Sequence, residues 1–238
     1  MDVYWLEQNS TDLPDGNDWL SAGDMARLNS MRFERRRADW RLGRWTAKCS
    51  LAVYLHLPSN FQTLTKIEIR AEPSGAPKVF LENEPANIAI SLSHRSGTAI
   101  CALADSGAAL GCDLEIIEPR SDAFVTDYFT AEEQAFVNQS QGANRSQLLA
   151  LLWSGKESAL KALGVGLRLD TRSLVVNSMG NDPAPDLSRS FDSHDWHPFD
   201  VRFGADIFQG WWQLTHNFLR TLVAAPAPSQ PIPLVILE

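Results

Sequence analysis

Two short acidic stretches carry the side chains with the clearest potential for chemistry. The first, residues 111–115, reads Gly-Cys-Asp-Leu-Glu and has strand character, so Asp113 and Glu115 share one face. The second reads W-S-G-K-E-S-A-L-K and has helical character, so Glu157 and Lys161, four residues apart, lie on one side. If the helix packs beside the strand, three carboxylates and an ammonium share one pocket. Such oxygen ligands suit Mg²⁺ held together with a phosphorylated ligand.

A simpler interpretation exists for the helical pair alone. Glu157 and Lys161 have the spacing of an exposed helical ion pair, which contributes only about 0.3–0.5 kcal/mol. Their convergence with Asp113, Glu115 and the basic residues described next favours a functional site instead.

A basic segment precedes these stretches. Between Arg27 and Lys48 there are eight basic residues and two acidic ones, on a chain whose net charge is -8. In a helix, Arg37, Arg41, Arg44 and Lys48 form a stripe beside an apolar one. We expect the helix to bury the apolar stripe and to offer the basic stripe to phosphates. A solvated helix face is the alternative.

A Ser-His pair lies at the end of a predicted strand. Residues 88–94 and 98–104 have strand character, and residues 95–97 form the turn between them. Ser93 and His94 therefore lie at the end of the hairpin, where binding residues are common. The sequence favours neither a structural nor a ligand-binding role for His94.

The order of elements predicts an α+β fold. Residues 1–20 contain an edge strand, and one helical region, capped by Ser21, continues to Pro58. Thr130 and Glu133 form a capping box, and capping is the structural alternative to any chemical role of Glu133. A long helix is expected over residues 146–163, after a break at 142–144, and it ends at Gly164. Residues 177–198 form a loop. Three closing strands follow around 199–203, 211–215 and 220–224, and the proline-rich tail is extended.

Helix followed by strands occurs twice along the chain. We expect an N-terminal half, residues 1–107, that contributes the basic helix, and a C-terminal half, residues 108–238, that contributes the metal site. A shared active site is expected in the cleft between the halves.

Composition narrows the class of protein. The chain has 238 residues, of which 44% are hydrophobic, and no apolar stretch is long enough for a membrane span. The acidic residues 1–7 lack the basic flank and apolar run of a signal peptide, so we expect none there. Its three cysteines are isolated, so we expect buried free thiols and a cytoplasmic location. The acidic net charge argues against general nucleic-acid binding.

The motifs G-x-D-x-E at 111–115 and W-x-x-K-E-x-x-x-K at 153–161, with Ser93-His94 and Gly43-Arg44 upstream, resemble those of the 4′-phosphopantetheinyl transferases. The resemblance is to the large, two-half type that includes the surfactin-synthetase activator, and it extends from about residue 30 to residue 176. It implies two similar α+β halves related by a pseudo-two-fold axis. It also implies coenzyme A as the donor substrate, Mg²⁺ as the cofactor, and a serine of an acyl or peptidyl carrier protein as the acceptor.

The resemblance also assigns roles to residues. It implies that Asp113, Glu115 and Glu157 hold the metal, that Lys161 contacts the pyrophosphate, and that Glu133 assists proton removal. The residues implied to bind coenzyme A are Arg44, Lys48, Gly75, Pro77, Lys78, Ser93, His94, Lys156 and Lys161. The usual Gly-Lys-Pro turn reads Gly75-Ala76-Pro77, and whether Lys78 replaces the missing lysine is open.

The chemistry expected of such a site is an in-line displacement at phosphorus. A serine hydroxyl attacks the β-phosphate of coenzyme A and 3′,5′-ADP leaves. The sequence leaves open whether Glu157, Glu133 or a metal-bound water accepts the proton. A metal-dependent phosphohydrolase and a non-catalytic coenzyme A-binding module are the alternatives. We expect a monomer, and the carrier protein and its pathway are not indicated by any motif.

Overall fold

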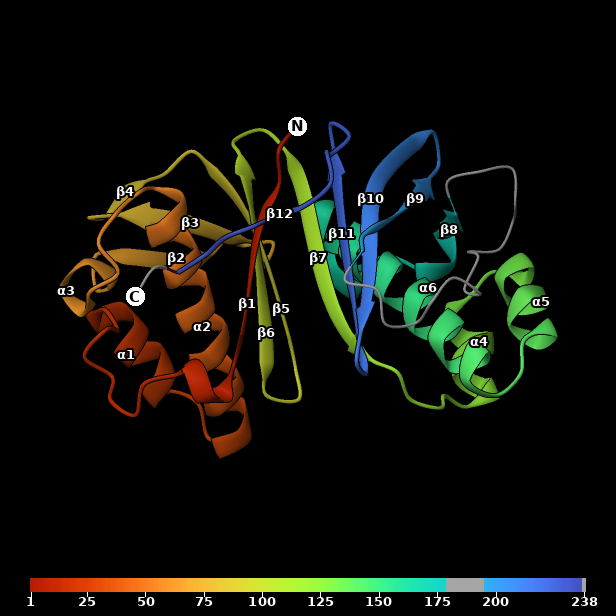
Figure 1. Cartoon of the computed structure of the whole chain (residues 1–238), viewed down its shortest axis with the longest axis horizontal. Helices are drawn as coiled ribbons and strands as arrows, with labels where there is room; N and C mark the ends of the chain where they lie inside the picture. The colour runs from red at the N-terminus through yellow and green to blue at the C-terminus, as the bar shows by residue number, and fades with distance from the viewer. Residues whose placement is uncertain (179–194, 237–238) are drawn as a thin grey trace. The chain divides into compact units, whose positions relative to one another are not determined.

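The computed structural model describes residues 1–178 and 195–236, and confirms a mixed α+β fold. The chain divides into two compact units. We call residues 2–108 with 232–238 the N-terminal unit, and Met1 with residues 109–231 the C-terminal unit. Figure 1 labels the elements of both units. Most of the predicted 177–198 loop lies outside the described residues.

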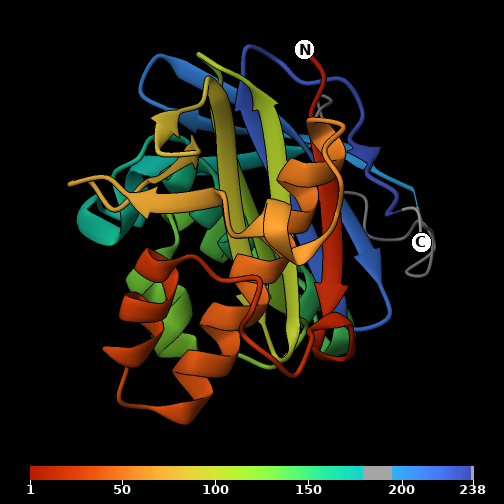
Figure 2. The ribbon, with the colours of Figure 1, turned by 90° about the vertical axis from the view of Figure 1, so that its left-hand side faces the viewer.

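The N-terminal unit is built on a sheet of order β12-β1-β6-β5. Its strands are β1 (Tyr4–Asn9), β5 (Ile88–Arg95), β6 (Thr98–Asp105) and β12 (Ile232–Pro233). A smaller sheet contains β2 (Ile67–Ala71), β3 (Pro77–Leu81) and β4 (Glu84–Pro85). The helices are α1 (Ala22–Asn29), α2 (Glu34–Tyr54), α3 (Phe61–Leu64) and the 3₁₀ turn Ser10–Asp12. Helix α2 packs against β6 and β1, as Figure 2 shows.

The single helical region expected from Ser21 to Pro58 is wrong, because α1 and α2 are separate helices. The start is confirmed: Ser21 caps α1 in a capping box with Asp24. The break follows Ser30, whose hydroxyl donates to the carbonyl of Arg27 at 2.7 Å and so competes with continued helical hydrogen bonding. Phe33 then adopts extended backbone angles before α2 begins.

The C-terminal tail departs from the expected domain boundary. Residues 232–238 belong to the N-terminal unit, although the order of elements predicted that they belong to the C-terminal half. The reason is strand pairing: β12 adds to β1 in parallel, with Ile232 beside Tyr4. Consequently β1 is covered along part of the edge that it was expected to expose.

The C-terminal unit contains a five-stranded antiparallel sheet of order β7-β11-β10-β9-β8. The strands are β7 (Ala109–Ile116), β8 (Leu174–Ser178), β9 (His197–Phe203), β10 (Asp206–Thr215) and β11 (Phe218–Ala225). The helices are α4 (Asp122–Tyr128), α5 (Ala131–Gln139), α6 (Gly142–Ala162) and the 3₁₀ turns Gly166–Arg168 and Thr171–Ser173. Helix α6 ends at Ala162, shortly before Gly164, as expected. Gly164 has a φ of 67°, in the left-handed region that favours glycine. It starts earlier than expected, because Gly142 is its first residue and not a break.

Helix α6 lies very close to strand β7. A Cβ built on Gly111 would lie 1.8 Å from the carbonyl oxygen of Ser158, so only glycine fits there. The contact continues through hydroxyl groups: Ser154 and Ser158 lie 2.8 Å and 2.6 Å from the hydroxyl of Thr221 on β11. The first glycine of the G-x-D-x-E motif therefore sets the approach of α6 to the strand that carries Asp113.

Each unit contains the same buried contact. Lys48 in α2 pairs with Asp24, the capping-box carboxylate of α1, at 2.7 Å. Lys156 in α6 pairs with Glu133, the capping-box carboxylate of α5, also at 2.7 Å. Both lysines are fully buried and occupy the fifteenth position of a 21-residue helix. The units thus share a structural device, while the pseudo-two-fold axis stays a prediction.

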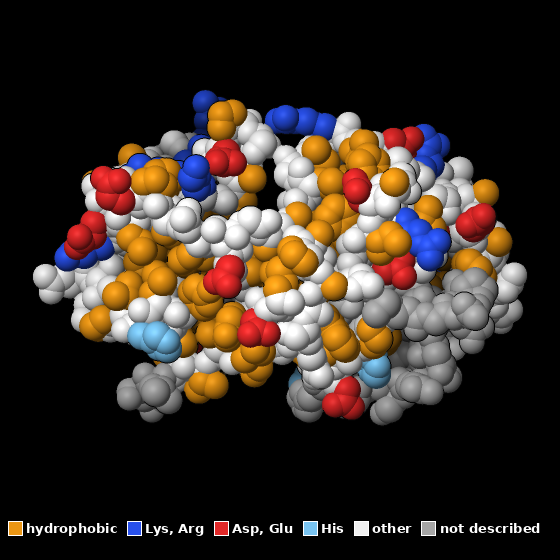
Figure 3. Space-filling model, turned by 90° about the horizontal axis from the view of Figure 1, so that it is seen from above, with side chains coloured by type: hydrophobic (Ala, Val, Ile, Leu, Met, Phe, Trp, Pro, Cys, Tyr) orange, Lys and Arg blue, Asp and Glu red, His pale blue; other side chains and the backbone are white. Residues whose placement is uncertain are grey.

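Separate apolar clusters stabilise the two units. One surrounds Trp19, Leu51 and Leu103 in the N-terminal unit, and the other surrounds Phe129, Leu151 and Phe199 in the C-terminal unit. The cysteines are free and buried, as predicted. Among the described residues, no helix is both long and apolar enough to cross a bilayer. On the face in Figure 3, basic side chains form small groups between acidic and apolar ones.

Candidate functional site

Strand β7 brings Asp113 and Glu115 to the face that α6 covers. Gly111, two residues earlier, contacts α6, and the alternation of the strand places the two carboxylates on that same side. Asp113 and Glu115 are only 5% and 8% exposed. Burial of two neighbouring carboxylates costs free energy unless cations or hydrogen bonds compensate.

Lys161 supplies one compensating charge. Its ammonium donates to Asp113 Oδ1 at 2.8 Å and to the carbonyl oxygen of Cys112 at 2.9 Å. Burial, the largest single effect, lowers the pKa of Lys161, but the charge and hydrogen bond of Asp113, together with Cys112 and the charge of Glu157, outweigh burial and the net shift is upward. The structure therefore brings these two predicted site residues together.

Arg120, which no sequence motif indicated, supplies a second charge. Its guanidinium lies 3.3 Å from Glu115 and 3.0 Å from Glu118, and it covers the ring of Phe124. The position follows Pro119, at the loop that leaves β7. Its position five residues after Glu115, the last carboxylate of the strand motif, was the sequence feature that could have indicated Arg120.

Glu157 completes the carboxylate group. Burial, the main cause, together with the charges of Asp113 and Glu115 raises the pKa of Glu157 to about 7, although Lys161 acts in the opposite direction. The carboxylates are thus close enough to affect one another electrostatically. Mg²⁺ prefers carboxylate oxygens as ligands, and a bound cation would relieve the repulsion between these negative charges. By their chemistry, the three residues therefore fit a divalent cation. Within the described residues, no cluster of three acidic, Cys or His side chains is already arranged around a cation position.

The structure places Lys156 and Glu133 in the core of the C-terminal unit. Besides their ion pair, Lys156 donates to the carbonyls of Thr171 and Leu174, and Glu133 accepts from the backbone of Thr130 and Val176. Lys156 is fully buried and Glu133 is 2% exposed. The capping interpretation of Glu133 is confirmed. We do not retain either residue as a ligand or catalytic group, because neither reaches the surface.

The basic side chains of the expected stripe on α2 also bond to groups within the N-terminal unit. Lys48 is fully buried and donates to the carbonyls of Trp19 and Leu64, in addition to its pair with Asp24. Arg44 donates to the carbonyl of Ile69 and lies 3.4 Å from Asp24. Arg41 donates to the carbonyls of residues 14–16. The stripe therefore faces the interior of the unit, contrary to the expectation that it is offered to phosphates.

The glycine-proline turn lies in the β2–β3 hairpin. Gly75 has a φ of 95°, and Pro77 begins β3. Lys78 is about half exposed and lies 3.5 Å from Glu72. No described contact relates Lys78 to the other predicted site residues, so its role stays a prediction.

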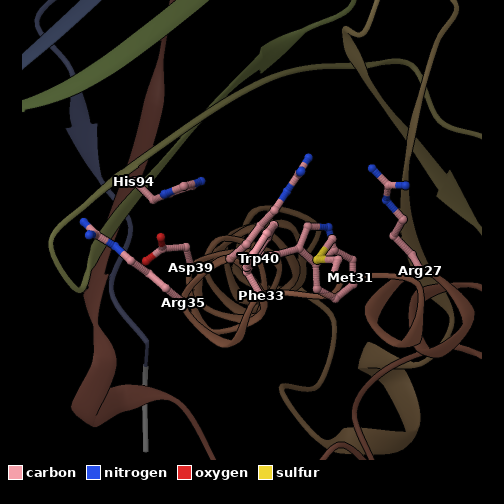
Figure 4. Close-up of a pocket in the computed structure, with 8 residues that line it drawn as sticks. Arg27, Met31, Phe33, Arg35, Asp39, Trp40 and His94 are labelled. Carbon is pink, nitrogen blue, oxygen red and sulfur yellow. The ribbon is translucent and has the colours of Figure 1, made fainter.

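Ser93 and His94 lie at the end of β5, before the turn at Ser96 and Gly97, which confirms the predicted hairpin. His94 is exposed and lines a pocket of about 420 Å³ in the N-terminal unit, shown in Figure 4. The other lining residues are Arg27, Met31, Phe33, Arg35, Arg36, Asp39 and Trp40.

This pocket combines cations with apolar and aromatic surface. Arg35 and His94 lie at one end of the view in Figure 4, and Arg27 at the other. Phe33 is 72% exposed and Trp40 partly exposed, so their rings are accessible to a planar group. The sequence placed these arginines in the basic segment but did not select them, because the break between α1 and α2 that exposes them was not predicted.

The region around the carboxylates resembles known proteins in sequence. A sequence profile of the 4′-phosphopantetheinyl transferase superfamily matches residues 109–215. The matched residues include strand β7 and helix α6, which carry the two motifs, so this part of the chain is similar to that superfamily. One relative, the 4′-phosphopantetheinyl transferase HetI of Nostoc sp., is 26% identical over 164 residues, which cover 68% of this chain and 67% of HetI.

Proposed function

We propose that the protein transfers the 4′-phosphopantetheine group of coenzyme A to a serine of an acyl or peptidyl carrier protein and releases 3′,5′-ADP. The observation that carries this proposal is the contact between Lys161 and Asp113 at 2.8 Å. It joins the helix motif to the strand motif within the region that matches the superfamily. Free buried thiols and the use of coenzyme A favour a cytoplasmic location.

Asp113, Glu115 and Glu157 are the residues that would hold Mg²⁺. When bound, the cation supplies positive charge to the pyrophosphate and to the charge that develops on its oxygens. The carboxylates contribute by donor chemistry, since oxygen ligands and several negative charges at short range favour a hard divalent cation. Lys161 contributes a positive charge on the same side of α6 as Glu157.

The proton of the carrier serine needs an acceptor. Glu157 is the best candidate, because it is partly exposed and belongs to the same group as Asp113 and Lys161. The serine oxygen forms a bond to the β-phosphorus as its proton moves to Glu157. The bond from that phosphorus to the bridging oxygen breaks, and Lys161 stabilises the negative charge left on 3′,5′-ADP.

The pocket of the N-terminal unit suits the nucleotide end of coenzyme A. Its arginines and His94 offer donors for phosphate oxygens, and Phe33 and Trp40 offer aromatic faces for the adenine. We assign no ligand to Arg44 and Lys48, because both pair with Asp24 inside the unit and Lys48 is fully buried.

Transfer is tested by incubating the protein with coenzyme A labelled in its pantetheine part, Mg²⁺ and a panel of carrier domains. We expect one carrier domain or more to gain the label, and no release of 3′,5′-ADP when the acceptor is omitted. Release without an acceptor would instead identify a phosphohydrolase. Binding of coenzyme A without transfer to any carrier domain would identify a non-catalytic module.

A further inference from the structure

Two basic side chains bind the carboxylates of β7 from different elements. Lys161 of α6 contacts Asp113 at 2.8 Å, and Arg120 of the loop after β7 contacts Glu115 at 3.3 Å. Their side chains are 29% and 26% exposed, whereas the carboxylates are almost fully buried. The two cations are therefore the part of this ion-pair group that reaches solvent.

We propose that Lys161 and Arg120 compete with the divalent cation for Asp113 and Glu115, so that cation binding is weak until the pyrophosphate of the substrate draws Lys161 away. This inference rests on the proposed function. It adds a coupling between the cation and the substrate that residue roles alone do not imply.

Geometry supports the competition at Asp113. A magnesium ion approaches a carboxylate oxygen to about 2.0–2.1 Å. An ammonium already hydrogen-bonded to the same oxygen occupies one of its lone pairs and repels the incoming cation. Lys161 is also anchored by the carbonyl of Cys112, on the same strand, so it is held at the carboxylate from two sides.

Lys161 is the side chain suited to change partners. Lysine carries a point charge on a flexible four-carbon stem, and phosphate oxygens are strong alternative acceptors. Arg120 is shared between Glu115 and Glu118, and its contact with Glu115 is longer, so we expect it to be the weaker competitor. By linkage, a substrate that takes Lys161 must strengthen cation binding by the same factor as the cation strengthens substrate binding.

The test is direct Mn²⁺ binding, followed by the electron paramagnetic resonance of free Mn²⁺, with and without coenzyme A. The proteins are the wild type, Lys161→Met, Lys161→Arg and Arg120→Gln. Lys66→Met is the matched control, because it breaks another lysine–carboxylate pair of 2.7 Å that is remote in sequence and exposed. Melting temperatures verify that each variant is folded, and the Arg variant keeps the charge if the Met variant does not fold.

Without coenzyme A, we expect Lys161→Met to bind Mn²⁺ at least about fivefold more tightly than the wild type, and Arg120→Gln to show a smaller gain. Coenzyme A should tighten Mn²⁺ binding to the wild type about tenfold, and to Lys161→Met much less. Lys161→Arg and Lys66→Met should resemble the wild type.

Equal or weaker Mn²⁺ binding by Lys161→Met overturns the inference, even where the wild type transfers phosphopantetheine. Failure of every protein to bind Mn²⁺, with or without coenzyme A, overturns both the inference and the proposed metal site. Transfer activity without any such coupling leaves the proposed function standing and removes only the competition.

Discussion

Lys156 and Glu133 form an ion pair of 2.7 Å in the core of the C-terminal unit. Burial, the largest effect, lowers the pKa of Lys156, and Glu133 opposes this shift. The pair joins α5 to α6, the helix that carries Glu157 and Lys161. The pair therefore fixes the helix that carries these two candidate site residues.

Replacement of Lys156 by Met should destabilise the protein by about 3–5 kcal/mol, because it leaves Glu133 buried without its cation. Denaturant unfolding measures the loss. The double variant Lys156→Met/Glu133→Gln should recover part of it, whereas Lys66→Met, at an exposed pair, should change little. A variant of normal stability with weak coenzyme A binding would instead restore Lys156 as a ligand.

Gly111→Ala should destabilise the protein by at least about 3 kcal/mol, because the new Cβ would collide with the backbone of Ser158. The matched control is Gly43→Ala in α2, where a new Cβ would lie 3.8 Å from the nearest side-chain atom, which belongs to His94, and alanine favours the helix. Relative to the wild type, the unfolding midpoint of Gly111→Ala should fall clearly, and that of Gly43→Ala should stay the same or rise. Equal midpoints would contradict the close contact between α6 and β7.

The stability of the protein in a chelator should fall as pH rises from about 5 to about 7. The pKa of Glu157 is raised to about 7 in the folded state, so the protonated carboxyl stabilises the folded protein relative to the unfolded one. This contribution to the free energy of unfolding decreases once the pH exceeds the pKa of the unfolded form, and it is lost as the pH passes the pKa of the folded form. The effect should be on the order of 2–3 kcal/mol.

Glu157→Gln isolates this contribution, since the amide does not titrate. Its unfolding free energy, measured at pH 5, 6, 7 and 8, should change less over the window than that of the wild type. If the two proteins lose stability in parallel, burial and the charges of Asp113 and Glu115 do not raise the pKa of Glu157 as described.

Arg35→Ala should raise the KM for coenzyme A on the order of tenfold with little change in kcat, because we propose that the pocket binds a part of the substrate that does not react. Steady-state transfer rates at varied coenzyme A concentration measure this. Arg32→Ala, at an exposed residue that does not line the pocket, should leave KM unchanged. Equal effects of both substitutions would indicate only a general charge effect.

The sequence predicted the positions of the two carboxylates and of Lys161 better than those of Lys48 and Lys156. Alternation along β7 and the spacing in α6 were sufficient to place Asp113, Glu115 and Lys161, because both patterns are local. Lys48 and Lys156 were predicted to be accessible, but both are fully buried; the sequence did not indicate this, since lysine is rarely fully buried and the partners of both are far apart in sequence. The repeated W-T-A-K and W-S-G-K at 45–48 and 153–156 was the signal that marked them as equivalent.

Other features depend on contacts that no local pattern contains. Pairing of β12 with β1 joins residues at opposite ends of the chain. The break between α1 and α2 depends on Ser30 and on the extended backbone of Phe33, in a segment without glycine or proline. Because that break opens the pocket, the pocket arginines could not be distinguished from their neighbours in the basic segment.

We propose that Glu157, grouped with Asp113 and Lys161, takes part in the transfer of phosphopantetheine. The most direct test is the mass of a carrier domain after incubation with coenzyme A, Mg²⁺ and either the wild type or Glu157→Gln. We predict that the domain gains one phosphopantetheine group with the wild type and none with the variant, while the variant still binds coenzyme A. Undiminished modification by a correctly folded Glu157→Gln would contradict the account.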